Sequence, residues 1–373
     1  MLDALQPFTM EGFDRARPLW QIRLVDGLGG GRSAMAMKLH HSLSDGVGLV
    51  QMMTSLVDLD REGGAPAPAP TAAPFQMMSI AERMLDALGY QRRRQVERAK
   101  RTLGALAEGL VGLVRDPLAA AREAARALTS TARLLRPISR PLSPIMGGRS
   151  TRVRLDVVTV DFRALKSAAR AAGGTLNDAF VAAVTAGLRL YHELHGQPVD
   201  TLRMTMPINL RSGESGRKAG NQFVPVRFAV PIAIADAVER MREIGRLARA
   251  QRAEPALPVV DELAALFNRF PAAVSAAMLG AMLKGVDFVT SNVPGPSFEL
   301  YVCGARIERM IGFGPLTGAA ANLTLFSYRG ECAIGISTDP AAVPDPDALV
   351  SCVRRGIDEV LAVAGAAAAR AGA

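Results

Sequence analysis

Residues 40–46 decide how this sequence is interpreted, and they read His40-His41-Ser42-Leu43-Ser44-Asp45-Gly46. They follow two β-prone runs, residues 20–28 and 32–39, which flank a Gly-Gly-Gly turn and so predict a β-hairpin. A helical pattern then extends from Val47 to Leu59. The two histidines therefore lie in a turn between a strand and a helix, where a side chain can be presented to a cleft.

The residue types in this turn suit acid–base chemistry. Imidazole has a pKa near neutrality, so a histidine can take a proton from an alcohol as that alcohol attacks a thioester carbonyl. A pair of histidines at a strand end can also be purely structural. The turn taken alone favours that structural alternative.

Further motifs stand in a fixed order around the turn. Its spacing, H-H-x-x-x-D-G, resembles the CoA-dependent acyltransferase superfamily that includes chloramphenicol acetyltransferase and peptide-synthetase condensation domains. Arg17-Pro18-Leu19-Trp20 precedes it, and Leu176-Asn177-Asp178 and Ser291-Asn292-Val293-Pro294-Gly295-Pro296 follow it. Together they resemble the R-P-L-W, N-D and S-N-V-P-G-P signatures of the bacterial wax ester synthase/diacylglycerol acyltransferases.

The resemblance implies roles for individual residues. His41 would be the catalytic base, with His40 and Asp45 as supporting residues and Gly46 leaving room for Asp45. Asn177 would lie opposite His41, although a plain helix-start residue is the alternative there. Substrate contacts are expected at five more positions: Trp20, Asp178, Asn292, Pro294 and Gly295. For the proline-rich turn, a purely structural role is an equal alternative.

The same resemblance implies a fold and a reaction. The family makes triacylglycerol or wax esters from fatty acyl-CoA and either diacylglycerol or a long-chain alcohol. Its fold is α/β, with two chloramphenicol-acetyltransferase-like lobes, mixed sheets and the catalytic histidine at the interface between the lobes. Acyl-CoA is a substrate, and no cofactor is expected. A catalytically weak or inactive lipid-binding protein of the same fold is the alternative, while condensation of carrier-protein thioesters is disfavoured by the proline-rich turn.

The chain divides into three segments. Residues 1–60 are assigned to the N-terminal acyltransferase lobe, residues 61–150 to an Ala/Pro linker with a basic helical connector, and residues 151–373 to the C-terminal lobe. Only 16 residues precede Arg17, where the family has a longer segment. The first lobe is therefore expected to be incomplete at its N-terminus.

The C-terminal lobe mixes strand and helix patterns without a regular β-α-β alternation, which favours a mixed sheet. Thr175 to Asp178 resembles a capping box, and it predicts a helix that continues to about His195. The strands are predicted near residues 153–158 and 204–207, and at 223–230, 286–291, 306–311, 322–328 and 332–338.

Charge is concentrated in the connector. The chain carries a net charge of +9, and residues 82–140 hold 13 Lys or Arg against 6 Asp or Glu. Apolar residues such as Leu85 and Leu103 recur there every three or four positions, with arginines between them, which predicts a basic amphipathic helix. This helix is expected to contact an anionic bilayer or a lipid droplet. Packing of its apolar stripe on the protein is the alternative.

Several other functional classes are disfavoured. Aromatic residues make up only 5% of the chain, so a base-stacking surface for nucleic acid is not indicated. Three cysteines without a C-x-x-C pair suggest neither a disulfide framework nor a thiolate metal site. The N-terminus lacks signal-peptide features, and the apolar run Ala272 to Leu283 is shorter than the roughly 20 residues that cross a bilayer. We expect a cytoplasmic protein, peripheral to the plasma membrane or lipid droplets.

Two segments leave minor alternatives open. His192 and His195 miss the H-E-x-x-H spacing by one residue, so no metal site is expected, and both are interpreted as surface residues near a helix end. The loop from Arg211 to Lys218 offers three cations that could bind the phosphates of CoA, but it matches no recognised phosphate-binding motif. A solvated surface loop is the favoured interpretation.

Overall fold

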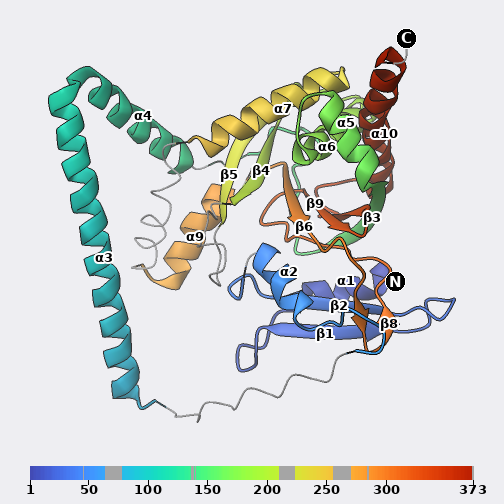
Figure 1. Ribbon diagram of the computed structural model, residues 1–373, viewed down its shortest axis with the longest axis horizontal. Coiled ribbons are helices and arrows are strands. Elements are labelled where there is room, and N and C mark those ends of the chain that lie inside the picture. Colours follow the sequence, from blue (N-terminus) through green and yellow to red (C-terminus); the bar gives the residue numbers. More distant parts are fainter. Residues whose placement is uncertain are drawn as a thin grey trace. The chain divides into compact units, whose positions relative to one another are not determined.

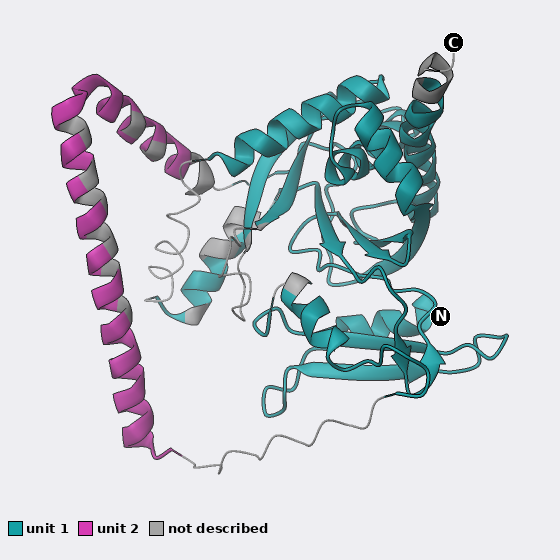
Figure 2. Cartoon of the chain, in the orientation of Figure 1, with its two compact units in different colours: residues 1–63, 134–373 teal, residues 64–133 magenta. Residues whose placement is uncertain are grey.

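A computed structural model of the chain describes residues 1–44, 46–63, 78–135, 138, 140–209, 223–254, 270–283 and 285–371. The chain forms two compact units, one of residues 1–63 and 134–373 and the other of residues 64–133 (Figure 2). Asp45, most of the Ala-Pro run and the loop from Arg211 to Lys218 lie outside the described residues.

A six-stranded mixed sheet organises the larger unit (Figure 1). Its strand order is β3 (Arg154–Asp161), β10 (Glu331–Thr338), β9 (Ala321–Tyr328), β6 (Phe288–Pro294), β4 (Thr201–Asn209) and β5 (Phe223–Pro231). The β3–β10, β10–β9 and β4–β5 pairs are antiparallel, whereas β6 runs parallel to both β9 and β4. The mixed α/β architecture predicted from the sequence is therefore confirmed.

One predicted strand is wrong. Of the run from Arg306 to Ile311, only Arg306 is in a strand, because β8 (Ala305–Arg306) pairs with β7 (Tyr301–Val302) and then ends. The chain continues irregularly beside the sheet, where Asn322 Nδ2 donates a hydrogen bond of 2.7 Å to Pro315 O. The apolar residues of this run are half-buried because they lie close to the sheet, and not because they join it.

Four helices complete the core of this unit: α5 (Phe162–Ala171), α6 (Leu176–Leu194), α7 (Ala237–Arg252) and α10 (Pro346–Ala371). Their buried side chains share one hydrophobic cluster with the strands. Helices α6 and α10 approach so closely that a Cβ atom added at Gly187 would lie 2.7 Å from Val353 Cα. Glycine is thus required where these two backbones meet. The apolar helix α9 (Ala272–Leu283) precedes β6.

Side-chain caps explain where two of these helices begin. Asp161 Oδ1 accepts a 2.7 Å hydrogen bond from Ala164 N at the start of α5. Thr175 Oγ1 accepts from Asp178 N, and Asp178 Oδ2 accepts from Thr175 N at 2.8 Å, which confirms the predicted capping box of α6. This box fixes the position of Asn177, which lies between its two members.

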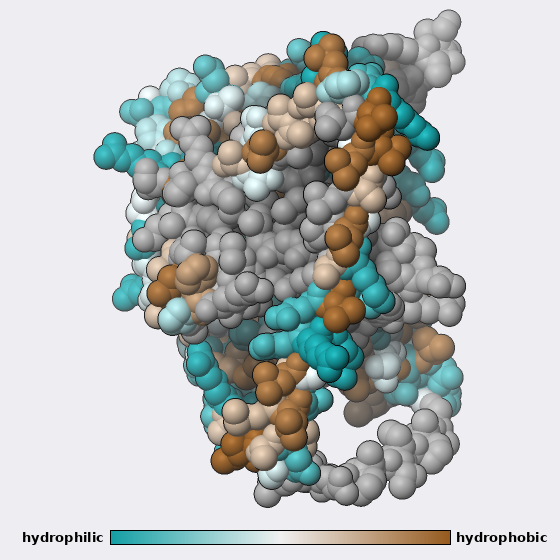
Figure 3. Space-filling view, turned by 90° about the vertical axis from the view of Figure 1, so that its left-hand side faces the viewer, coloured by the Kyte–Doolittle hydropathy of each residue, from teal (hydrophilic) through white to brown (hydrophobic). Residues whose placement is uncertain are grey.

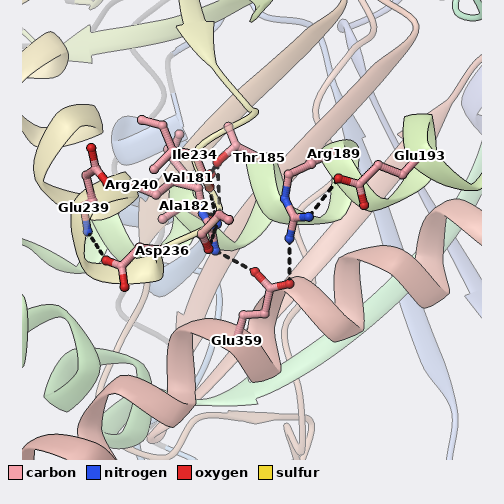
Figure 4. Close-up of polar contacts among 11 residues, drawn as sticks. Val181, Ala182, Thr185, Arg189, Glu193, Ile234, Asp236, Glu239, Arg240 and Glu359 are labelled. Atoms are coloured by element: carbon pink, nitrogen blue, oxygen red, sulfur yellow. Dashed lines mark hydrogen bonds and ion pairs between the residues drawn. The ribbon is translucent and has the colours of Figure 1, made fainter. Parts of the chain in front are cut away.

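An ion-pair cluster connects α6, α7 and α10 (Figure 4). The fully buried side chain of Arg240 donates to Glu359 Oε2 at 2.8 Å and to the carbonyl oxygens of Ala182, Ile234 and Ala235. Arg189 donates to the other oxygen of Glu359 at 2.9 Å. Burial lowers the pKa of Arg240, and the carboxylate of Glu359 opposes that shift.

The N-terminal segment contains α1 (Leu2–Met10), β1 (Trp20–Val25), β2 (Ala34–Leu39) and α2 (Gly46–Thr54). The predicted hairpin is confirmed, with Trp20 paired to Leu39. Helix α2 ends before the predicted Leu59, because the chain turns at Ser55 and Leu56 and then joins the rest of the unit. Asp58 and Tyr301 exchange two backbone hydrogen bonds, of 2.8 and 2.9 Å.

The smaller unit holds two helices, α3 (Ile80–Arg115) and α4 (Pro117–Leu135), and α3 contains the predicted basic amphipathic pattern. Ser79 and Glu82 form a capping box at the start of α3. Asp116 caps α4 through a 2.9 Å hydrogen bond from Ala119 N, with Pro117 at the first helical position. Within the described parts of the chain, no helix is both long and apolar enough to cross a membrane.

Candidate active site

The first histidine of the turn, His40, is held by hydrogen bonds of its backbone and its ring. His40 N donates to Leu19 O at 2.9 Å, which ties this residue to the R-P-L-W motif. Its Nδ1 accepts from Ser42 N at 3.2 Å and lies 2.7 Å from Ser42 Oγ. Because Nδ1 accepts, the ring proton of neutral His40 is on Nε2. The ring also meets Phe13 edge-on, with centroids 5.8 Å apart, so its orientation is fixed.

His41, like His40, is exposed. It follows the last residues of β2 and lies in a turn closed by a 3.0 Å hydrogen bond from Leu43 N to His40 O. Ser44, two residues before the start of α2, is buried. The turn therefore ends at a buried residue, while the side chain of His41 is exposed.

Gly46 brings the turn against the S-N-V-P-G-P motif. A Cβ atom at Gly46 would lie 3.1 Å from Cγ2 of Val293 in β6, so glycine allows the start of α2 to approach this strand. Two motifs far apart in the sequence are thus in contact. The predicted role of Gly46 in accommodating Asp45 stays a prediction, since Asp45 lies outside the described residues.

The central sheet opens beside this contact. Strands β4 and β6 pair only through Met204 with Phe288 and Thr205 with Val289, after which β4 continues with β5 and β6 with β9. Asn177 Nδ2 donates to Sδ of Met206, the first residue of β4 beyond the opening, at 3.6 Å. Asn292 lies beyond the same point on β6. Asn177 and Asn292 are therefore associated with the two strands that separate here.

Asp178 is buried and makes its described contacts within the protein. Besides closing the capping box, its carboxylate is flanked by glycines, because a Cβ at Gly174 or Gly245 would lie 3.3 or 3.1 Å from Oδ2. This environment gives Asp178 a structural role at the start of α6. The predicted contact of Asp178 with substrate stays a prediction.

A pocket of about 420 Å³ contains three predicted residues, Asn292, Pro294 and Gly295. The remaining lining residues are Phe162, Leu176, Pro296, Ser297, Ser327, Tyr328, Arg329 and Gly330. Sequence reasoning missed Phe162, Tyr328 and Arg329. The sequence held a signal for Tyr328 and Arg329. Arg329-Gly330 stands between two apolar runs, which is typical of a two-residue hairpin turn, and both Arg329 and Gly330 have positive φ.

Other predicted residues lie outside this pocket. His41, Asn177 and Trp20 are not among its lining residues within the described parts of the chain. Trp20 is 51% exposed at the start of β1, directly across the hairpin from Leu39, the residue before the two histidines. The structure thus places Trp20 near the turn along the hairpin and leaves its role a prediction.

His192 does not occupy the surface position expected for it. Its side chain is fully buried, with Nε2 lying 2.7 Å from Ser143 Oγ and Nδ1 lying 2.8 Å from Leu188 O. Because a carbonyl oxygen only accepts, Nδ1 donates and Nε2 accepts from the Ser143 hydroxyl. Burial lowers the pKa of His192. Among the described residues, no cluster of His, Cys, Asp or Glu could hold a metal ion.

Comparison with known families identifies the family of the chain. The wax ester synthase/diacylglycerol acyltransferase (WS/DGAT) catalytic domain matches residues 5–180, and the WS/DGAT C-terminal domain matches residues 219–360. The chain belongs to the WS/DGAT family. Members of this family are acyltransferases, so the partners of the chain are an acyl donor and an acceptor lipid.

Relatives of the chain in the WS/DGAT family occur in Mycobacterium tuberculosis strain H37Rv. One, named "Putative diacyglycerol O-acyltransferase", is 34% identical over 377 residues, covering 99% of this chain and 74% of the relative. Another of the same name is 30% identical over 364 residues, covering 95% and 75%. The family predicted from the ordered motifs is therefore confirmed.

Solved structures share the WS/DGAT fold. The wax ester synthase/diacylglycerol acyltransferase from Marinobacter aquaeolei VT8 matches with a TM-score of 0.61 at 20% identity, covering 98% of this chain and 76% of that one. The starter condensation domain of rhizomide synthetase matches with a TM-score of 0.51 at 14% identity, covering 94% and 70%. These likenesses confirm the predicted acyltransferase fold.

Proposed function

We propose that the chain transfers a fatty acyl group from acyl-CoA to diacylglycerol or a long-chain alcohol, with His41 as the general base. One observation carries the proposal. The turn that exposes His41 is anchored at Gly46 against Val293, next to the residues Asn292 and Pro294 that line the 420 Å³ pocket. An accessible base and a substrate-sized pocket are thus joined by one strand of the sheet.

The chemistry follows from the residues of the turn. His41 takes the proton of the acceptor hydroxyl while the oxygen attacks the thioester carbonyl. The carbon–sulfur bond then breaks, an ester forms, and the proton passes from His41 to the departing thiolate of CoA. His40 acts as a positioning residue, since its hydrogen bonds to Leu19 O and Ser42 fix the backbone that carries His41. The thioester itself supplies the leaving group, so the reaction as written requires no cofactor.

The two asparagines complete the proposal. Asn177 and Asn292 have amide groups that can hydrogen-bond to a carbonyl or hydroxyl oxygen. Asn177 contacts Met206 of β4, and Asn292 belongs to β6, the strand that separates from β4 at the opening. We assign them to orienting the acyl donor and the acceptor. Pro294 and Gly295 form a stiff wall of the pocket, in which an acyl or alkyl chain is expected to lie. Because both classes of acceptor are insoluble in water, the reaction takes place at a lipid surface.

The test measures CoA release from palmitoyl-CoA by the purified chain without acceptor, with hexadecanol and with dioleoylglycerol. Acceptor-dependent release with formation of the matching ester is the expected result. Release that is the same without acceptor would indicate a thioesterase. Lipid binding without any release would favour the alternative of an inactive lipid-binding protein, and either result would contradict the proposal.

A further inference from the structure

We propose that helix α3 binds an anionic lipid surface by lying flat on it, with two apolar patches inserted and a basic belt between them at the level of the lipid phosphates. This inference goes beyond the proposed chemistry. Its test uses no acyl-CoA, so it succeeds or fails independently of the acyltransferase reaction.

The apolar side chains of α3 are exposed in two groups. Patch 1 comprises Met84, Leu85 and Leu88, and patch 2 comprises Leu103, Leu110 and Val114, with exposed fractions between 59% and 84%. Contiguous exposed apolar surface marks an interaction site. The described side chains of α3 are exposed along the whole helix, glycines aside, so both patches are accessible within their own unit.

Basic residues separate the two patches. Arg92, Arg93 and Lys100 lie between them along the helix, and Figure 3 shows a hydrophilic region between two hydrophobic ends of the column formed by this helix. Arg92 precedes Leu110 by 18 residues, which is five helical turns at 3.6 residues per turn. Arg92 therefore lies on the apolar side of the helix and interrupts it.

This arrangement suits a lipid interface better than a bilayer span. The 36 residues of α3 extend over about 54 Å at 1.5 Å per residue, beyond the roughly 30 Å of the hydrocarbon core. A span would also place the basic belt in hydrocarbon. A helix lying in the interface instead lets the apolar stems of arginine and lysine lie beside acyl chains, while their charges reach the phosphates.

The pattern also argues against a partner helix. A coiled coil requires apolar residues every seven positions along its seam. The seam through Val96, Leu103 and Leu110 meets Gly89 and Glu82 when it is extended toward the N-terminus. Moreover, a protein partner on the apolar side would bury the charge of Arg92, which is costly without a matched anion. Anionic lipid headgroups supply that anion at the required depth.

The test is flotation of the whole chain with vesicles of phosphatidylcholine alone and of equal parts phosphatidylcholine and phosphatidylglycerol. Leu85→Ser with Leu88→Ser removes patch 1, Leu103→Ser with Leu110→Ser removes patch 2, and Arg92→Gln with Arg93→Gln weakens the belt. The matched control is Arg170→Gln with Arg355→Gln, which removes two exposed charges from the other unit. Far-UV circular dichroism and thermal melting accompany each variant.

We expect the wild type to bind the anionic vesicles, and less so as salt rises. Each basic residue near the surface is worth roughly fivefold in partitioning, so the belt variant, which lacks two, should lose about 25-fold and the control little. Either patch variant should bind less at unchanged melting temperature.

Three outcomes would overturn the inference. Equal binding to neutral vesicles would remove the role of the belt. Full binding by both patch variants would remove α3 as the element involved. A lower melting temperature in the patch variants, or loss of a dimer measured by light scattering, would mean that protein and not lipid covers the apolar side.

Discussion

At the scale of single residues, the hydrogen bonds of His40 show how the turn is held. His40 is fixed by Ser42 and Leu19, and both histidines are exposed in this turn. The sequence motif predicted separate roles for His40 and His41 only through a family resemblance. The accepting Nδ1 of His40 depends on the fold of the turn and could not be derived from composition or spacing.

Replacing His41 by alanine tests its role as the base. A positioned general base is worth about 100- to 10,000-fold in rate, or roughly 3–5 kcal/mol of barrier, so His41→Ala should lose activity by about that factor. Initial rates of CoA release in the presence of acceptor provide the measurement. His195→Ala, at the C-cap of α6, is the residue-matched control and should keep its rate. A folded His41→Ala variant with wild-type activity would remove the proposed mechanism.

The buried His192 makes stability depend on pH. Its pKa is lowered in the folded state, so below the unfolded value of about 6.5 the unfolded chain binds a proton that the folded chain does not. The free energy of unfolding should therefore fall as pH decreases below about 6.5, until the lower folded pKa is reached. Urea unfolding across this range is the measurement.

His192→Gln should flatten this pH dependence, while His195→Gln, at the C-cap of the same helix, should retain it because His192 is still present. The Gln variant is also expected to be less stable at neutral pH, since Ser143 loses its imidazole partner. An unchanged pH dependence in His192→Gln would show that this histidine is not responsible.

At the scale of helices and strands, close backbone contacts determine packing. Helix α10 approaches α6 at Gly356, where an added Cβ would collide with Ala183 O and lie 2.7 Å from Gly187 N. Gly356→Ala should destabilise the protein by about 1–3 kcal/mol or more through overpacking. Gly365, in the same helix, has nothing within 4 Å of its Cβ position, so Gly365→Ala should instead stabilise by about 0.5–1 kcal/mol. A lower melting temperature for Gly356→Ala and a higher one for Gly365→Ala would support this difference in packing.

The ion pairs around Glu359 should contribute unequally to the free energy of unfolding. Glu359→Ala leaves the buried guanidinium of Arg240 without its carboxylate, which should cost about 3 kcal/mol. Glu193 pairs with Arg189 and is 45% exposed, so Glu193→Ala should cost less than about 1 kcal/mol. Chemical denaturation of both variants makes the comparison. Equal losses would mean that burial of Arg240 does not determine the energetics of the cluster.

Much of the element pattern was predictable because it depends on local sequence. The hairpin of β1 and β2 and the capping box of α6 follow from turn glycines and from Thr175 with Asp178. The run from Arg306 to Ile311 misled because half-buried apolar residues beside a sheet resemble a strand. Helix α1 was missed, since it contains Pro7 and only two buried residues. The position of Asn177 beside Met206, and the pocket residues Phe162 and Tyr328, depend on pairings between distant strands that a single sequence does not reveal.

At the scale of the whole molecule, the two units differ in how their backbone is protected. Helix α10 is buried on one side in the larger unit, whereas the described side chains of α3 are exposed. Amides of α3 should therefore exchange with solvent by local opening, faster than those of α10, β9 and β10. Hydrogen–deuterium exchange followed by mass spectrometry gives the comparison, with α10 as the matched long helix. Equal protection of α3 and α10 in the free protein would contradict this expectation.

The order of strands in the sheet also governs how the protein is made. Strand β3 ends at Asp161 and pairs with β10, which begins 170 residues later at Glu331. At about 5–20 residues per second, a ribosome needs roughly 10–30 s to synthesise that interval. Throughout this time the nascent chain carries β3 without its neighbour, and an unpaired strand edge is a site of aggregation. The sheet is completed late, when the hairpin of β9 and β10 leaves the ribosome and inserts between β3 and β6, which were synthesised earlier.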